Sequence, residues 1–161
     1  MTEILFYQLQ GQTLERVLPP LLQKSLERGW RVAVKAASEE RVEALDAHLW
    51  TWRDDVFLPH GTWRDDQPEA QPVLLTVSDD NPNGATVRFL LEGAAAPADV
   101  SIYQRLVVLF DGEDQDALAA ARQHFSAARS AGLTVTYWLA DENGRWQRQA
   151  EPPKLSTGSA S

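Results

Sequence analysis

Short apolar runs recur along the chain, and between most of them the apolar residues follow a helical period. Runs of this length are typical of strands buried in a sheet. They predict strands at residues 4–9, 30–36, 72–78, 85–93, 105–111 and 133–140. RLVVLFD, at 105–111, is the most strand-like of them. The later stretch ENGRWQR is expected to form a turn and a short extension.

Three helices are predicted between these strands. The first covers about residues 13–28, where leucines recur at helical spacing. The second begins at Ser38, a favourable N-cap residue followed by two glutamates. The third is an alanine-rich helix that Asp114 can cap and that extends to about Ala131, and Gly132 stands directly after it, where glycine commonly ends a helix.

The alternation of strands and helices predicts the fold class. Such a chain forms right-handed crossovers and a mainly parallel sheet with helices on both faces. One stretch, TVSDDNPNGATVRF, joins two strands through the turn signal Asn83-Gly84 with no helix between them, so a mixed sheet is expected. We expect one α/β domain over residues 1–149 and a disordered polar tail at 150–161.

Length and charge narrow the function. A chain of 161 residues is large enough for one domain with a sizeable core. Its 15 basic and 23 acidic residues give a net charge of −8. Proteins that hold nucleic acid along its backbone normally present a basic face, so DNA or RNA is not expected to be the main direct partner. A local basic patch can still attract an acidic peptide, because salt screens charges beyond about 8–10 Å.

The sequence gives no sign of a membrane or secreted protein. It contains no cysteine, which excludes disulfides and thiolate metal sites and fits a reducing compartment. It has no apolar run of about 18 residues. Its first residues, MTEILFYQLQ, lack the basic start and apolar centre of a signal peptide. A cytoplasmic protein is therefore expected.

A doubly wound sheet often carries a nucleotide site. The phosphates would bind after the first strand, where a glycine-rich loop leads into a helix. That junction reads YQLQGQTLE, with one glycine and neither GxGxxG nor GxxxxGK[ST]. No functional nucleotide site and no cofactor are expected.

The repeated sequence WRDD raises the possibility of a metal site. Its acidic residues and a nearby histidine are potential ligands for a divalent ion: Asp54, Asp55, Asp65, Asp66 and His60. Neighbouring aspartates in an extended loop point apart, however, and arginines in both copies are available to pair with them. We expect no metal site. The remaining histidines have no nucleophile context, so a nucleotide- or metal-dependent hydrolase is kept only as an alternative.

The segment LWTWRDDVFLPHGTWRDDQP is unusually aromatic for a loop. It contains Trp50, Trp52, Phe57 and Trp63, with Pro59 between them. One or two of these side chains are expected to pack under the sheet edge. Four exceed what an Asp- and Pro-rich loop usually encloses, and partly exposed aromatics beside prolines are typical of a protein interface. The segment is therefore predicted to contact another protein.

The last helix carries a second candidate surface. Arg122, Phe125 and Arg129 lie at positions i, i+3 and i+7, which share one stripe of a helix. Two guanidinium groups beside an aromatic ring suit an acidic peptide that ends in an apolar residue and a free carboxylate. The alternative is that Phe125 belongs to the core and the arginines only favour the C-terminal half of the helix.

The order of several stretches resembles the chi subunit family of bacterial DNA polymerase III. These stretches are ILFYQL, GWRVAVKAASEERVEALDAHLWTWRDDVFLPHG, LVVLFD and FSAARSAGLTVTYW, between Ile4 and Trp138. The resemblance implies a three-layer, Rossmann-like α/β sandwich without a working nucleotide site. It also implies a non-catalytic adaptor that joins the clamp loader to single-stranded-DNA-binding protein by gripping the acidic C-terminal tail of that protein.

The resemblance further implies roles for individual residues. Arg122 and Phe125 match the tail pocket, while a lysine of well-known members falls on Leu118 here. Arg129 is available to compensate for that lysine.

The opposite surface binds the psi subunit in the family. Trp50 and Phe57 match its contact residues, and Trp52 and Pro59 are included in the candidate surface. The partner at this surface is expected to be psi, another clamp-loader protein or a helicase, with DNA reached only through partners.

Overall fold

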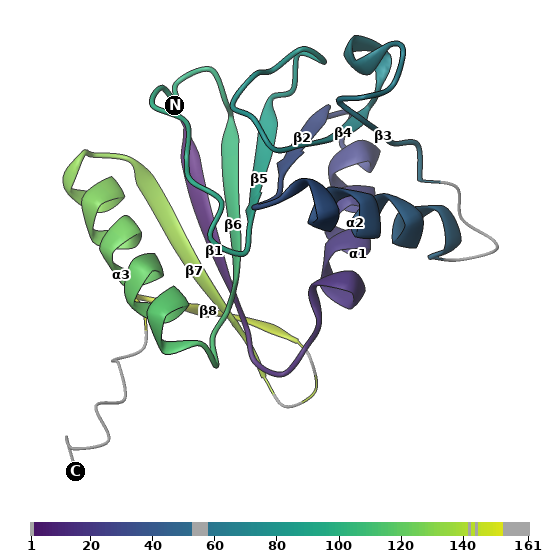
Figure 1. Ribbon diagram of the computed structural model, residues 1–161. Helices are drawn as coiled ribbons and strands as arrows, with labels where there is room; N and C mark the ends of the chain where they lie inside the picture. Colours follow the sequence, from purple (N-terminus) through teal and green to yellow (C-terminus); the bar gives the residue numbers. More distant parts are fainter. Residues whose placement is uncertain (1, 53–57, 142, 144, 153–161) are drawn as a thin grey trace.

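The computed structural model describes residues 2–52, 58–141, 143 and 145–152 (Figure 1). Within these ranges the chain forms eight strands in one sheet, three α-helices and a short 3-10 helix. The strands are β1 (Glu3–Leu9), β2 (Val32–Lys35), β3 (Gly61–Thr62), β4 (Val73–Thr76), β5 (Val87–Leu91), β6 (Arg105–Asp111), β7 (Thr134–Ala140) and β8 (Trp146–Gln149). The helices are α1 (Leu14–Glu27), α2 (Glu39–Thr51), α3 (Gln115–Ser130) and the 3-10 helix η1 (Pro68–Ala70).

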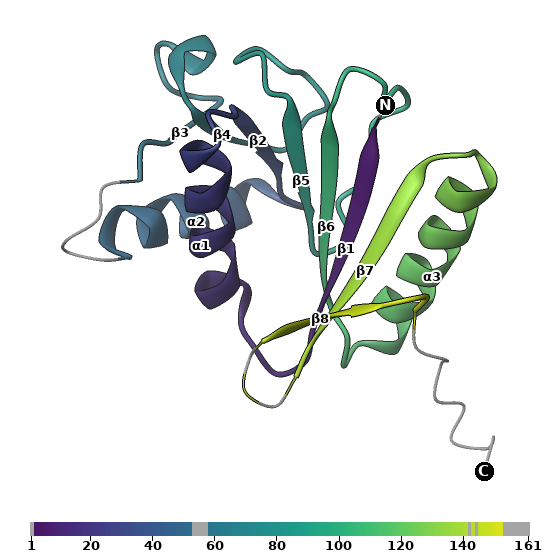
Figure 2. The ribbon, with the colours of Figure 1, turned by 180° about the vertical axis from the view of Figure 1, so that it is seen from behind.

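The sheet has the order β3-β4-β2-β5-β6-β1-β7-β8. Every neighbouring pair is parallel except β7 and β8, which are antiparallel. Helices α1 and α2 lie on one side of the sheet and α3 on the other, as the two opposite views show (Figures 1 and 2). The three-layer α/β fold with a mainly parallel, mixed sheet is therefore confirmed.

The antiparallel pair is not where the sequence placed it. The Asn83-Gly84 turn was expected to break the parallel order, yet β4 and β5 both run parallel to β2, one on each side of it. The loop between β4 and β5 carries the chain back across the sheet, so that β5 starts at the same end as β4. The Asn83 amide anchors this loop by donating to the carbonyls of Val32 and Gln71, at 3.1 and 2.9 Å.

The predicted helix ends are confirmed. Ser38 Oγ accepts a hydrogen bond from the backbone N–H three residues later, which caps α2. Asp114 Oδ1 caps α3 by accepting from the N–H groups of Asp116 and Ala117, at 2.9 and 3.2 Å. Gly132 follows α3 with φ +84°, a conformation that favours glycine. Short-range sequence signals are sufficient for these boundaries.

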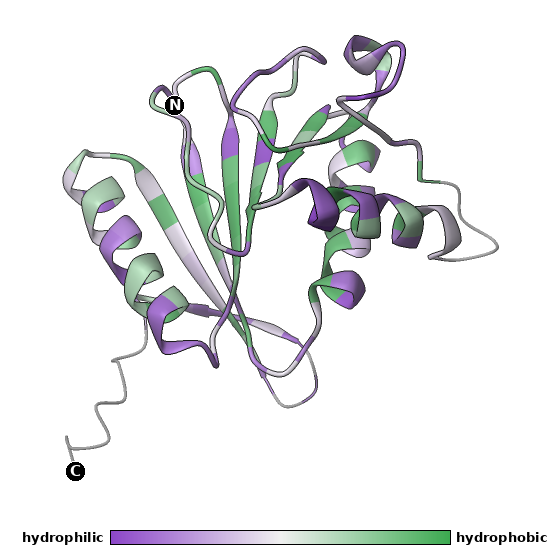
Figure 3. Cartoon of the chain, in the orientation of Figure 1, coloured by the Kyte–Doolittle hydropathy of each residue, from purple (hydrophilic) through white to green (hydrophobic). Residues whose placement is uncertain are grey.

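Two apolar cores lie on the two sides of the sheet. The larger one packs α1 and α2 against the sheet and includes Val34, Leu75 and Phe89. The other packs α3 against the opposite side and includes Phe6 and Tyr137. Figure 3 shows the hydrophobic colour concentrated on the central strands and hydrophilic colour on parts of α2 and α3. None of the helices in the described part of the chain has the length and apolar character needed to cross a bilayer.

A buried arginine fixes the loop after β4. Arg88 has no exposed surface, although it carries a charge. Its guanidinium donates to Tyr103 Oη at 2.8 Å, to the Ser78 carbonyl at 3.0 Å and to the Asp80 carbonyl at 2.6 Å. Because buried polar groups need partners, these bonds tie the loop and Tyr103 to the start of β5.

Candidate protein-binding surfaces

The first candidate surface, called here the indole surface, consists of Trp50, Trp52 and Pro59 at the C-terminal end of α2. Trp50 is 57% exposed, an unusual value for so large an apolar side chain. Trp52 and Pro59 are half-buried. Phe57, which was predicted to belong to this surface, lies outside the described residues.

Trp50 rests on a fixed histidine. The rings of Trp50 and His60 have their centroids 4.6 Å apart. The His60 side chain is fully buried, with Nδ1 2.8 Å from the Leu58 carbonyl and Nε2 3.0 Å from Asp46 Oδ1. Because both ring nitrogens are engaged, the imidazole is a rigid support for the exposed indole.

The second WRDD copy has a structural role. Trp63 is half-buried against the larger core, and the Arg64 guanidinium lies 4.8 Å from its ring centroid. Arg64 also contacts the carboxylates of Glu39 and Glu43 on α2, at 2.7 and 3.2 Å. Asp65 accepts a hydrogen bond from the Thr62 N–H at 2.9 Å. This tryptophan is therefore one of those that pack at the sheet edge.

The potential metal ligands that the structure describes do not converge on one point. The described residues contain no group of three or more His, Asp or Glu side chains placed to hold an ion. His60 is engaged by Leu58 and Asp46. Asp65 holds the turn after β3, while Asp54 and Asp55 lie outside the described residues.

The second candidate surface, called here the α3 surface, contains Leu118, Arg122, Phe125 and Arg129. Leu118 and Phe125 are 5% and 3% exposed and belong to the smaller core. The Phe125 ring packs against those of Phe6 and Tyr137, with centroid distances of 5.7 and 6.0 Å. The structure thus places Phe125 in the core, and the outer part of the α3 surface consists of the two arginines.

The two arginines lie about one helical turn before and one turn after Phe125 on α3. The Arg129 guanidinium is 5.6 Å from the Phe125 ring centroid, and the residue is exposed. Arg122 is half-buried, and its Nη1 donates to the Pro152 carbonyl at 3.1 Å. Sequence reasoning missed Pro152, which is buried and brings the chain beyond β8 against α3. The prolines in the polar stretch AEPPK were the only available signal.

Burial shifts the pKa values of two titratable groups near the α3 surface. It raises the pKa of the Tyr137 hydroxyl, and the nearby Arg122 charge opposes this shift. The Tyr137 hydroxyl donates to Gln8 Oε1 beneath the helix. Burial also lowers the pKa of His124, whose ring packs edge-on against Phe6 at 5.1 Å. Both groups favour their neutral forms, so Arg122 and Arg129 dominate the charge of this surface.

The junction expected for a nucleotide phosphate has a different arrangement. Gly11 adopts φ +85° between β1 and α1. The Gln10 N–H, which faces this turn, donates to Gln12 Oε1 at 2.8 Å. The Gln12 side chain therefore accepts the hydrogen bond of a backbone N–H group at the place where a phosphate would accept it in a nucleotide-binding protein.

Comparison with known proteins gives the same family as the resemblance noted in the sequence. Residues 1–136 match the family described as DNA polymerase III chi subunit, HolC. The chain is 23% identical over 121 residues to the probable DNA polymerase III subunit chi of Rickettsia prowazekii, covering 69% of this chain and 71% of the relative. It is 26% identical over 115 residues to the DNA polymerase III subunit chi of Pseudomonas aeruginosa, covering 71% and 78%.

Proposed function

The chain belongs to the DNA polymerase III chi subunit family, whose members are accessory subunits of the replicative polymerase, and we propose that it acts as a non-catalytic adaptor. In this role it joins the clamp-loader complex to single-stranded-DNA-binding protein. The α3 surface binds the acidic C-terminal tail of that protein, and the indole surface binds the clamp-loader side.

One observation carries the tail-binding proposal: Arg122 and Arg129 lie about one helical turn before and after the same aromatic residue, in a chain of net charge −8. Guanidinium groups recognise carboxylates through paired hydrogen bonds. A basic spot on an acidic protein also orients an acidic peptide toward that spot. Because Phe125 is buried, the apolar end of the peptide is expected to contact the stems of the arginines and the edge of the smaller core.

The indole surface supports a second, separate contact. An indole that is 57% exposed and held by a buried histidine is a preorganised anchor for a partner protein. The proposed partner is psi, another clamp-loader protein or a helicase. Because the indole surface is on α2 and the tail site is on α3, both partners can bind together.

Tail binding is tested by titrating the protein into a fluorescent peptide that ends in Asp-Ile-Pro-Phe. Arg122→Ala is expected to weaken binding by about 1.5–3 kcal/mol, through loss of a charge-assisted pair. Arg64→Ala is the matched control, since it removes the same charge from the α2 side and should leave binding unchanged. Equal affinities for the wild type and Arg122→Ala would refute the proposed site.

A further inference from the structure

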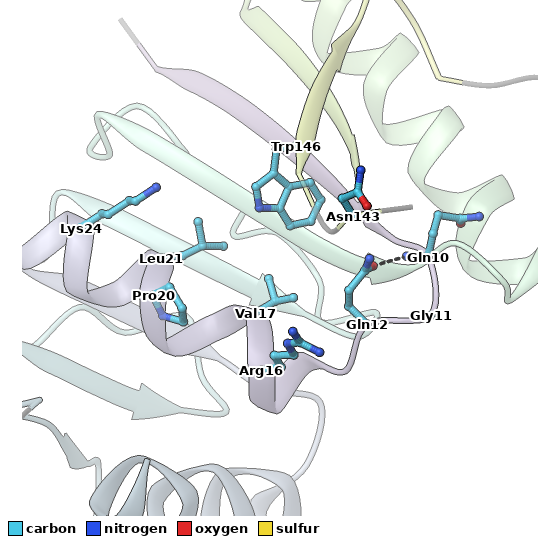
Figure 4. Close-up of a pocket in the computed structure, with 10 residues that line it drawn as sticks. All are labelled: Gln10, Gly11, Gln12, Arg16, Val17, Pro20, Leu21, Lys24, Asn143 and Trp146. Carbon is cyan, nitrogen blue, oxygen red and sulfur yellow. Dashed lines mark hydrogen bonds between the residues drawn. The ribbon is translucent and has the colours of Figure 1, made fainter. Parts of the chain in front are cut away.

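A groove separates α1 from the strands at the β8 end of the sheet. It consists of two adjoining cavities of about 540 and 250 Å³, which share Leu21, Lys24 and Trp146 among their lining residues. Figure 4 shows the larger cavity, with α1 on one side and Trp146 of β8 on the other. This groove is on the α1 side of the sheet, whereas the α3 surface is on the opposite side.

The charge of the groove contrasts with that of the whole chain. Its described lining includes four basic residues and no acidic one: Arg16, Lys24, Arg28 and Arg105. Three of these follow one row of α1 and its C-cap, because Lys24 comes eight positions after Arg16, and Arg28, the C-cap residue, comes four positions after Lys24. At 1.5 Å per residue, they are spaced about 12 and 6 Å along the helix axis. A row of cations thus runs along one wall.

The other wall is aromatic. Trp146 lines both cavities and meets the Tyr7 ring edge-on, with centroids 4.9 Å apart. Trp138 stacks on Tyr7 at 6.2 Å with an angle of 12° between the rings. Trp138 and Trp146 are both half-buried, so each retains some exposed ring surface.

The far end of the groove combines both features. The guanidinium groups of Arg28 and Arg105 lie 5.0 and 4.8 Å from the Trp30 ring centroid. Arg105 also pairs with Glu3 at 3.4 Å. Arg28 therefore contributes the freer charge at this end, and its residue is exposed.

We propose that this groove binds a short stretch of single-stranded nucleic acid, with phosphates along the cationic row of α1 and bases against the aromatic wall. Grooves that bind single strands combine cations that follow the backbone with aromatic rings on which bases stack. A duplex keeps its bases stacked on one another, so it cannot use the aromatic wall. The carboxylates of an acidic peptide would pair with the cations, but such a peptide has no bases to stack on the tryptophans.

The net charge of −8 limits the strength of this contact without excluding it. Salt screens charges more than about 8–10 Å apart, so a strand inside the groove responds mainly to the lining residues. Repulsion from the rest of the surface favours a short bound segment and weak binding that falls steeply with salt. This site is independent of the adaptor role and requires no partner protein.

The test uses fluorescence anisotropy of a fluorescein-labelled 15-nucleotide oligo(dT) with the full chain in low salt. Saturable binding is expected, and Lys24→Glu should weaken it at least tenfold. Arg64→Glu is the matched control, because it reverses a charge at an exposed position beside α2, outside both the groove and the α3 surface. Circular dichroism checks that both variants are folded. An equal loss in both variants would overturn the proposal, because net charge and not the groove would then govern binding.

Three further measurements separate this proposal from its rivals. Trp146→Ala should weaken oligo(dT) binding several-fold, and Trp146→Phe should recover part of the loss. A duplex of the same length should bind at least fivefold more weakly than the single strand. The proposal fails if no saturable binding occurs up to about 100 µM protein, the weak end of non-specific affinities for nucleic acid. It also fails if the duplex binds equally, or if poly-glutamate displaces the strand at an equal concentration of charge.

Discussion

Arg122 on α3 donates a hydrogen bond to the backbone carbonyl of Pro152, 3.1 Å away, although the two residues are 30 positions apart in sequence. The contact holds the segment after β8 against the proposed tail-binding site. It also places a neutral oxygen on a guanidinium group that is proposed to bind a carboxylate. The chain itself therefore competes with the ligand at this position.

Truncation after Gln149 is expected to increase affinity for the Asp-Ile-Pro-Phe peptide two- to tenfold. In the full chain the peptide must displace the hydrogen bond between Arg122 and the Pro152 carbonyl. The truncated chain lacks this bond, whose net contribution is about 0.5–1.5 kcal/mol. Anisotropy titration of the same peptide measures the gain. In an Arg122→Ala background the truncation should bring no gain; a gain there would show that the segment acts through other residues.

Trp50→Ala is expected to abolish capture of the clamp-loader partner while changing the free energy of unfolding by less than about 1 kcal/mol. The reason is that more than half of this indole is already in water. Leu49→Ala is the matched comparison, since the neighbouring residue is 4% exposed and should cost about 2–5 kcal/mol. Urea denaturation and a pull-down give the two readouts. If Trp50→Ala destabilised the fold as much as Leu49→Ala, the side chain would have to be counted as core.

Tyr103→Phe is expected to destabilise the protein by about 1–3 kcal/mol without changing peptide binding. The variant keeps the ring but leaves Arg88 Nε buried without its partner. Thermal or chemical denaturation measures the change. A neutral effect would mean that water or another acceptor replaces the hydroxyl at no cost.

The stability of the protein is expected to fall below neutral pH partly through His124. Burial lowers the pKa of this imidazole in the folded state, so between the folded and unfolded values the unfolded chain binds more protons. Its contribution is present above the unfolded value of about 6.5 and is lost as the pH falls toward the folded value. Unfolding curves at several pH values should show a shallower loss over this window for His124→Gln than for the wild type. Identical slopes would contradict the assignment.

Local signals were sufficient for most of the fold. The apolar runs, the caps at Ser38 and Asp114 and the glycine at 132 predicted the main strands and helices to within two residues. The order of the strands and the antiparallel pairing of β8 were out of reach, because they depend on contacts between distant segments. The Asn83 turn was identified correctly, but nothing in its sequence shows that it anchors a crossover between parallel strands.

The candidate sites were less predictable than the fold. A stripe at i, i+3 and i+7 is the same for a core-facing and a surface-facing row, so the burial of Phe125 could not be distinguished from exposure. The exposed indole of Trp50 was foreseen from composition, whereas the support by His60 and Asp46 was not. The groove lining has no local signature, because it comes from separate segments: β1 and its loop, α1 and the residues after it, β5, β6 and the β7–β8 region.

The sheet that separates α2 from α3 also fixes the position of the indole surface relative to the α3 surface. Its central strands are hydrogen-bonded to neighbours on both edges and packed on both faces, so the described strands form a continuous packed connection between α2 and α3. Two proteins held at these positions would be kept at a constant separation and relative orientation. In the proposed adaptor role, any change in the distance between the two bound proteins would therefore have to arise within those proteins and not within this domain.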